Sequence, residues 1–158
     1  MKYAIYRNTK KPTGRRGDDA GIDIYVPEDF PKTKLYIGEQ VNIPTGIKVV
    51  VPAGYMLKAE NKSGVAAKKG LTCGACVVDF SYRGEIHANL FKAVKGSEDS
   101  YDQETNRWYT IIRPGDKIVQ FILEKISDEE LEEISVEEYD NLPATDRGAG
   151  AFGSTGAK

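Results

Sequence analysis

Ser63 and Gly64, in the stretch ENKSGVAAKKG, could form an anion site. They open a predicted helical turn, where free backbone N–H groups and a hydroxyl favour a bound phosphate. Lys62 adds a flexible positive charge beside them. An ordinary helix N-cap has the same pattern, so this stretch alone leaves both interpretations open.

A carboxylate and an aromatic ring follow the apolar segment ACVVD. Asp79 ends this segment, where a carboxylate can orient or deprotonate a water molecule. Tyr82 stands in the turn that follows, and its ring could support a sugar or a base. The alternative is a plain hairpin, with Asp79 in an Asx turn and Tyr82 covering the core.

The two cysteines, Cys73 and Cys76, raise the possibility of a zinc or redox site. Zinc requires two further ligands, and the single histidine, His87, cannot complete four. A thioredoxin-type pair begins a helix in a βαβ unit, whereas this pair leads into a strand. We therefore expect two reduced, partly buried cysteines, and His87 on a polar strand face with Glu85 and Asn89.

Asp23 and Gln120 are polar residues inside strand-like patterns, and each could simply face solvent. The last twelve residues, RGAGAFGSTGAK, contain too much glycine for a stable helix or strand. They nevertheless include Arg147, Phe152 and a Gly-Ser-Thr-Gly that could wrap an anion. A frayed terminus is the alternative.

Short strands must position these residues. Alternating or β-branched segments recur about every ten residues between Gly and Pro turns, as in a sandwich, jelly roll or barrel. We expect strands within residues 2–7, 21–26, 41–55 (two pieces around Pro44-Thr45-Gly46), 55–61, 75–80, 85–94, 107–113 and 116–126.

Two stretches favour helical turns. Residues 63–70 could make one or two turns behind Ser63 as N-cap, and residues 127–135 have a capping-box pattern from Ser127 to Glu130. The polar stretch 95–106 is expected at a hairpin tip.

Length and composition indicate a single globular domain. The chain has 158 residues, 40% of them hydrophobic, and a net charge of -2, which argues against a dedicated nucleic-acid or membrane surface. No apolar run reaches spanning length and no signal peptide opens the chain, so we expect a cytosolic or nuclear protein. The basic KKPTGRR and the acidic DEELEEISVEEYD are interpreted as solvated surface.

The order of five motifs resembles that of the trimeric deoxyuridine triphosphatases (dUTPases), from about Ala20 to Gly156. The resemblance implies an all-β, jelly-roll subunit of the β-clip type, with a body over residues 1–140 and a flexible glycine-rich tail over 141–158. It implies a homotrimer with shared active sites that hydrolyses dUTP to dUMP and pyrophosphate with Mg²⁺. Water attacks the α-phosphate, and the reaction removes dUTP and supplies dUMP for thymidylate synthesis. The motifs are AGID, SGVAAKKGL, DFSYRG, GDKIVQ and RGAGAFGSTG.

The resemblance also implies site residues. Asp79 orients the attacking water and touches the sugar 3′-hydroxyl, Tyr82 stacks under the deoxyribose, and Asp23 lies near the metal through water. Uracil would be read by a hairpin that includes Gly74, Cys76 and Val77. The phosphates would contact Lys62, Ser63, Gly64 and Gln120. In the tail, Arg147 would hold the terminal phosphate and Phe152 would cover the base, and the remaining substrate contacts are Gly153, Ser154 and Thr155.

Three features depart from the family pattern. Lys62 replaces the usual arginine, Cys76 replaces the usual glycine, and residues 95–106 form a longer excursion.

Two other functions stay open. A dCTP deaminase on the same fold would need a carboxylate over the base, for which Glu85 is the nearby candidate. A non-enzymatic switch would bind a protein partner through residues 95–106. Nucleic-acid and membrane partners are not expected, and a viral source would place the protein in the host cytoplasm or nucleus.

Overall fold

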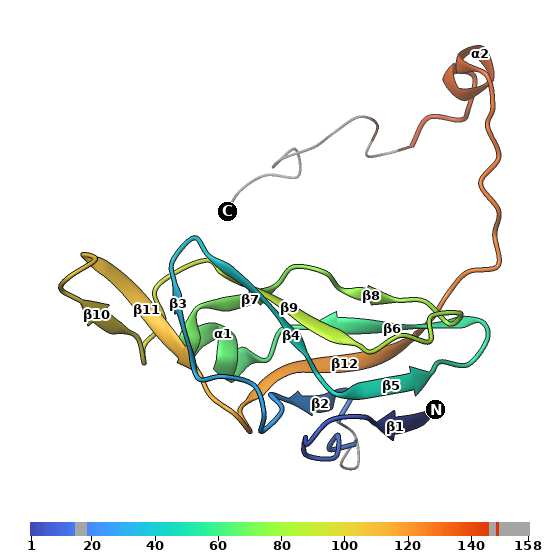
Figure 1. Ribbon diagram of the computed structural model, residues 1–158. Helices are drawn as coiled ribbons and strands as arrows, with labels where there is room; N and C mark the ends of the chain where they lie inside the picture. The colour runs from blue at the N-terminus through green and yellow to red at the C-terminus, as the bar shows by residue number, and fades with distance from the viewer. Residues whose placement is uncertain (15–18, 146–147, 149–158) are drawn as a thin grey trace. The chain divides into compact units, whose positions relative to one another are not determined.

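Short strands dominate the computed structural model, which describes residues 1–14, 19–145 and 148 (Figure 1). The helices are α1 (Ser63–Lys69) and α2 (Val136–Asp140). The strands are β1 (Lys2–Ile5), β2 (Ile22–Tyr25), β3 (Thr33–Tyr36), β4 (Gln40–Pro44), β5 (Ile47–Val50), β6 (Tyr55–Glu60), β7 (Leu71–Cys73), β8 (Val77–Val78), β9 (His87–Lys92), β10 (Ser100–Asp102), β11 (Arg107–Ile112) and β12 (Lys117–Lys125).

Antiparallel pairing joins these strands into small sheets. Their strand orders are β1-β5, β10-β11-β3, β2-β12-β6-β8 and β4-β9-β7. The all-β, jelly-roll class that the sequence predicts is confirmed. Strand β12 lies inside its sheet, because it pairs with both β2 and β6.

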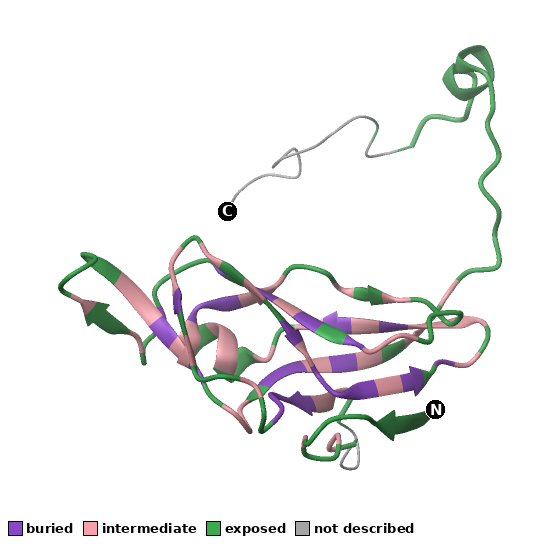
Figure 2. Cartoon of the chain, viewed as in Figure 1, coloured by how far each residue is buried: buried purple, intermediate pink, exposed green. Residues whose placement is uncertain are grey.

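The core lies between the inner faces of these sheets, where Figure 2 shows the buried residues. Ile43, Leu90 and Phe121 are each at most 1% exposed and come from β4, β9 and β12. Successive side chains of a strand point to opposite faces. In β12, Phe121 therefore enters the core while Gln120 and Ile122 stay on the partly exposed face.

Most expected strands are present, and three strands were not expected. Strands β3, β7 and β10 have three or four residues each and no strong apolar alternation. Pairing creates them, since β3 and β10 both pair with β11 and β7 pairs with β9. The expected strand over 75–80 shortens to Val77–Val78.

Both helix predictions need correction in detail. Helix α1 lies where expected, but its N-cap is Lys62, with no side-chain cap hydrogen bond, so the prediction of Ser63 as N-cap is wrong. The helix predicted over 127–135 is also wrong, because the structure places α2 at Val136–Asp140, with Ser135 Oγ accepting the Glu138 N–H at 3.1 Å. The acidic run DEELEE sets like charges at helical spacing, which disfavours a helix there.

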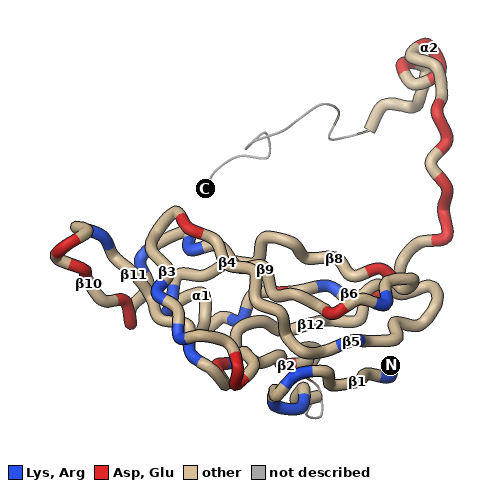
Figure 3. The backbone as a smooth tube through the Cα atoms, viewed as in Figure 1, with Lys and Arg blue, Asp and Glu red and all other residues tan. Residues whose placement is uncertain are grey.

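Contacts within the chain divide it into two units, Met1–Ser127 and Asp128–Lys158. In the second unit, the described residues are all exposed (Figure 2), and acidic residues are frequent along the stretch that includes α2 (Figure 3). The predicted boundary between residues 140 and 141 stays a prediction. Among the described residues, no helix is long and apolar enough to cross a membrane.

Candidate active site

Two lysines converge on the carboxylate of Asp23. Lys62 Nζ binds Asp23 Oδ1, and Lys117 Nζ lies 2.9 Å from Asp23 Oδ2. The Asp23 side chain is 17% exposed, whereas that of Lys117 is 48% exposed. Two ammonium groups therefore lie next to solvent at this carboxylate, and they can bind an anionic ligand.

Competing effects set the charge state of Asp23. Burial by itself raises the pKa of this carboxyl, but hydrogen bonds and charge from Lys62 and Lys117 outweigh burial and lower the pKa below its ordinary value. The pKa of Lys117 is raised, chiefly by its hydrogen bond to Asp23. The carboxylate is therefore ionised at neutral pH.

Gln120 lies opposite Asp23 in the β12–β2 register. Its Nε2 donates to the Asn61 carbonyl oxygen at 3.0 Å, which ties β12 to the segment before α1. Gly21 is required below it, because a Cβ there would lie 2.3 Å from Gln120 Oε1. Both contacts fix the amide beside Asp23.

These side chains line a pocket of about 420 Å³, which we call the lysine pocket. Ser63 and Gly64 follow Lys62 directly and are exposed, and a Cβ added to Gly64 would meet open space. The structure thus brings together three predicted site residues here, with two more adjacent. The lysine pocket is lined by Thr13, Gly14, Asp19, Ala20, Gly21, Asp23, Lys62, Lys117, Gln120 and Ile122.

A second pocket of about 190 Å³, the hairpin pocket, holds the other predicted group. Tyr82 is fixed there by its backbone N–H, which donates to the Asp79 carbonyl at 3.1 Å, and by its hydroxyl, which donates to the Glu85 carbonyl at 3.0 Å. Gly84 lets the ring approach, since a Cβ would lie 2.2 Å from the hydroxyl. The hairpin pocket is lined by Ala75, Cys76, Val77, Val78, Asp79, Tyr82, Glu85, Ile86, His87 and Phe121.

The backbone of the hairpin pocket is held on both sides. The Cys76 carbonyl accepts the Ala59 N–H at 2.6 Å, and the Gly74 N–H donates to the Asn89 carbonyl at 3.0 Å. A Cβ on Gly74 would lie 2.1 Å from Asn89 Oδ1, so a larger residue would displace the Asn89 side chain. These contacts hold the backbone N–H and C=O groups of the segment in fixed directions. The segment can therefore form hydrogen bonds to the edge of a flat ring.

Both cysteines are free and partly buried, as predicted. Burial raises the pKa of the Cys73 thiol to about 11, with smaller contributions from Cys76 and Glu60. A protonated thiol is a poor nucleophile at neutral pH, which supports a structural role for Cys73.

Sequence reasoning missed Lys117 and assigned His87 only to a polar strand face. Lys117 belongs to the GDKIVQ stretch that includes Gln120, so its position next to a predicted contact was the available signal. His87 is exposed on β9 as predicted, and it also lines the hairpin pocket. Its Nδ1 lies 3.0 Å from the Glu85 carbonyl oxygen.

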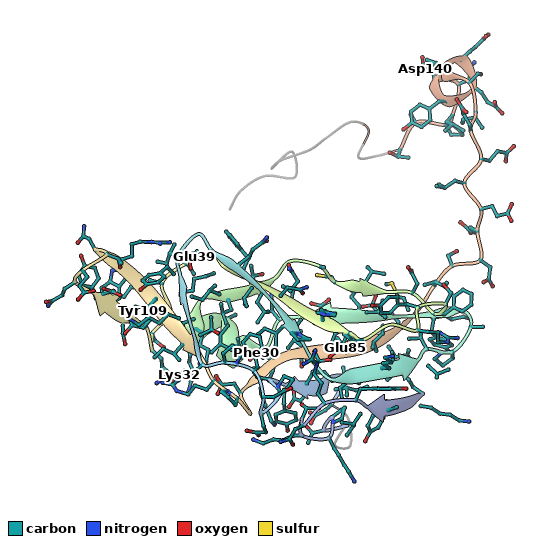
Figure 4. The ribbon with its side chains drawn as sticks, in the orientation of Figure 1. Phe30, Lys32, Glu39, Glu85, Tyr109 and Asp140 are labelled. Carbon is teal, nitrogen blue, oxygen red and sulfur yellow. The ribbon has the colours of Figure 1, made fainter. Side chains whose placement is uncertain are left out.

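Glu85 is committed to the fold. Its Oε1 accepts the Arg7 Nε–H at 2.9 Å and the Gly46 N–H at 2.8 Å, beside the turn that joins β4 to β5 (Figure 4). Both hydrogen bonds use the Glu85 side chain to hold Arg7 and the backbone of the turn. This arrangement removes the support for a deaminase that uses Glu85.

The five tail residues predicted to contact substrate lie outside the described residues. The structure therefore neither places them nor separates them from the two pockets. They are Arg147, Phe152, Gly153, Ser154 and Thr155.

The carboxylates of the lysine pocket, Asp19 and Asp23, suit a metal ion that the substrate also helps to hold. In the part of the chain that is described, no cluster of three or more His, Cys, Asp or Glu side chains could hold a metal ion. Mg²⁺ in nucleotide sites is often held by one or two carboxylates, by phosphate oxygens and by water. Asp19 and Asp23 in the lysine pocket fit such a substrate-carried ion.

The comparisons with known proteins agree with this arrangement. The deoxyuridine 5′-triphosphate nucleotidohydrolase of Candida albicans is 37% identical over 147 residues, which are 93% of this chain and 81% of that protein. The corresponding protein of Mus musculus is 32% identical, over 92% of this chain and 77% of its own.

Solved structures match over nearly the whole chain. A mutant dUTPase of Staphylococcus bacteriophage 80alpha, solved with dUpNHpp, has a TM-score of 0.77 at 25% identity and covers 99% of this chain and 98% of its own. A mutant dUTPase of phage phi11, in which a structural Mg(II) ion is coordinated, shares the fold with a TM-score of 0.69 at 23% identity, over 87% of this chain and 97% of its own. A family model described as dUTPase matches residues 7–98. The fold, the two pockets and these relatives agree, and the chain belongs to the dUTPase family.

Proposed function

We propose that this chain hydrolyses dUTP to dUMP and pyrophosphate, which removes dUTP and supplies dUMP for thymidylate synthesis. The observation that carries the proposal is the presence of one pocket that contains Lys62 and Lys117 and of another that contains Asp79 and Tyr82. Its relatives of known name are dUTP nucleotidohydrolases.

The lysine pocket takes the triphosphate. Lys62 and Lys117 offset the phosphate charge, and Gln120 turns its amide toward the same space. Ser63 and Gly64 add a hydroxyl and a backbone N–H at an exposed position next to Lys62. Lys62 stands where the family usually has arginine. It keeps the positive charge but lacks the two parallel N–H donors of a guanidinium group.

The hairpin pocket takes the nucleoside. The backbone from Gly74 to Val77 reads uracil, and the Tyr82 ring supports the deoxyribose. The Asp79 carboxylate accepts a hydrogen bond from a water molecule and aims it at the α-phosphorus. The water oxygen bonds to the α-phosphorus and its proton passes to the Asp79 carboxylate, while the bond from the α-phosphorus to the bridging oxygen breaks and pyrophosphate leaves with the electron pair.

The acidic side chains of the lysine pocket would hold a Mg²⁺ ion together with the triphosphate. Such an ion would supply charge neutralisation at the phosphates and at the leaving oxygen. Asp23 and Asp19 would hold it through coordinated water, and the two lysines keep Asp23 ionised for this role.

We infer that a second copy of the chain completes each site. Gln120 and Phe121 are adjacent in β12, and they line the lysine pocket and the hairpin pocket respectively. Because adjacent residues of a strand point to opposite faces, one nucleotide cannot occupy both pockets of one chain. A homotrimer with active sites at subunit interfaces joins a lysine pocket to the hairpin pocket of a neighbour.

Substrate profiling tests the proposal. Purified chain is incubated with Mg²⁺ and each of dUTP, UTP, dTTP, dCTP, dATP and dGTP, and pyrophosphate and nucleotide products are measured. We expect dUTP alone to yield pyrophosphate and a monophosphate at a high rate. Conversion of dCTP to dUTP would instead establish the deaminase, and no turnover of any nucleotide would overturn the proposed function.

A further inference from the structure

Lys92, in β9, is a fully buried cation. Its side chain and that of Asp99 are both 0% exposed, and Lys92 Nζ lies 2.6 Å from Asp99 Oδ2. Lys92 Nζ also donates to the carbonyl oxygens of Lys69 and Val94, each at 2.7 Å. An ammonium has three N–H donors, so these partners use all of them.

This network holds the C-terminal end of α1. The last carbonyls of a helix lack partners within it. Here the Ala67 carbonyl accepts from the Ser97 N–H at 3.1 Å, and the Lys68 carbonyl accepts from the Glu98 N–H at 2.8 Å. With the Lys69 carbonyl on Lys92, three consecutive carbonyls are bound by the segment over 92–98.

The loop around Gly96 packs closely against the C-terminal end of α1. A Cβ on Gly96 would lie 2.2 Å from the Lys68 carbonyl oxygen, and a Cβ on Gly70 would lie 1.9 Å from the Val94 carbonyl oxygen. Gly96 is also held by its N–H, which donates to Asp99 Oδ2 at 2.9 Å. No side chain fits between this loop and the helix end.

The other end of α1 leads into the lysine pocket. Helix α1 has seven residues, so it is about 10 Å long and its two ends move together. Just before it, Lys62 binds Asp23, and the Asn61 carbonyl accepts from Gln120. The Lys92 network and Lys62 are therefore joined by one short helix.

We propose that Lys92 and Asp99 are positioning residues for the triphosphate. By fixing the C-terminal end of α1, they set the place of Lys62, Ser63 and Gly64 at its other end. The proposal rests on the proposed function, and it assigns a role to the first part of the long 95–106 excursion. The resemblance to the dUTPases assigns no role to this stretch.

The test uses the neutral double variant Lys92→Met with Asp99→Asn, which leaves no buried charge. Its affinities for dUMP and for a non-hydrolysable dUTP analogue are measured by calorimetry, together with its melting temperature. We expect analogue affinity to fall about tenfold, because misplaced groups bind poorly, while dUMP affinity changes less than about twofold. The matched control is Glu98→Gln, which breaks the exposed Lys68–Glu98 pair between the same segments and should leave both affinities unchanged.

A second variant covers the case in which the double variant does not fold. Gly96→Ala pushes the loop off the helix end without changing any charge, and we expect the same selective loss of analogue affinity. Unchanged analogue affinity in a folded variant, or an equal loss for both ligands, would overturn the positioning role. Failure of the proposed function is read separately, as absence of dUTP turnover in the unaltered chain.

Discussion

Gln120 and Phe121 are consecutive residues of β12 whose side chains line different pockets. Gln120 lies with Asp23 and Lys62 in the lysine pocket, and Phe121 forms part of the wall behind Asp79. One strand thus separates the pocket that contains the two lysines from the pocket that contains the Asp79 carboxylate. Under the proposed function, each chain would contribute one half to each of two sites.

Complementation between two inactive variants tests this division. Asp79→Asn removes the hairpin-pocket carboxylate, and Gln120→Ala removes a lysine-pocket amide. Each alone is expected to be nearly inactive, but trimers refolded from an equal mixture should regain about a quarter of the activity, since a site can combine two intact halves. Turnover is measured before and after refolding, and each variant refolded alone is the control. No gain on mixing would mean that both pockets serve one chain.

Asp79→Asn is expected to separate catalysis from binding. The amide keeps the shape of the side chain but cannot orient water as a carboxylate does, so turnover should fall about a hundredfold or more. Affinity for a non-hydrolysable dUTP analogue should stay close to that of the unaltered chain. Near-normal turnover would place the catalytic carboxylate elsewhere.

Cys76→Gly is expected to change base discrimination. Cys76 lines the hairpin pocket, and its thiol points back to the Gly74 carbonyl at 3.9 Å, so its removal enlarges the space next to the base. We expect kcat/KM for dTTP to rise relative to dUTP, by about tenfold for the loss of a small buried group. Cys73→Ser, outside the pocket lining, is the control. An unchanged ratio would show that Cys76 does not touch the base.

Asp23→Asn is expected to lower stability in a pH-dependent way. The folded-state pKa of Asp23 lies below its unfolded value of about 3.9, so the ionised carboxylate stabilises the fold above that pH. The contribution is lost as the pH falls through the folded pKa. At pH 7 the variant should melt about 2–4 °C lower than the unaltered chain, and the difference should shrink below about pH 4.

The control for this pH experiment is Asp29→Asn. Asp29 is 51% exposed and lies 3.4 Å from Arg7, so its ion pair should contribute little at any pH. A melting difference for Asp23→Asn that stays constant between pH 7 and pH 3 would contradict the assignment of Asp23 as an ionised partner of two lysines.

Deletion of residues 147–158 is expected to remove most turnover and leave the melting temperature unchanged. The resemblance to the dUTPases implies that Arg147 contacts the terminal phosphate and that Phe152 covers the base, so the deletion should remove interactions made around bound substrate. Binding should weaken less than turnover, and Phe152→Ala should show a milder form of the same defect. Full turnover by the shortened chain would make this segment dispensable.

Local physical chemistry allowed the sequence to predict much of this protein. Alternation and Gly or Pro turns located most strands, because period-two patterning and turn geometry act over a few residues. The order of motifs singled out Asp23, Lys62, Asp79 and Gln120, and the structure brings these residues into the two pockets. Ser63, Gly64 and Gly74 lie beside the pockets.

Tertiary pairing decided the rest. Strict alternation would place Lys117 and Gln120 on opposite faces of β12, but a register shift between Lys117 and Val119 returns Lys117 to the face of Asp23. Such a bulge exists only in the pairing with β2. Strand β10 likewise exists because it pairs with β11.

The burial of Lys92 is the clearest feature that the sequence could not predict. In the sequence it is one lysine in a strand, and lysine is almost never fully buried unless it is paired. Only the folded chain brings Asp99 and the end of α1 to it. The sequence by itself therefore determined which residues are candidates for nucleotide binding and where most strands form. Long-range contacts determined which of these residues share a pocket, because a side chain's neighbours depend on strand register and on loops that no local pattern encodes.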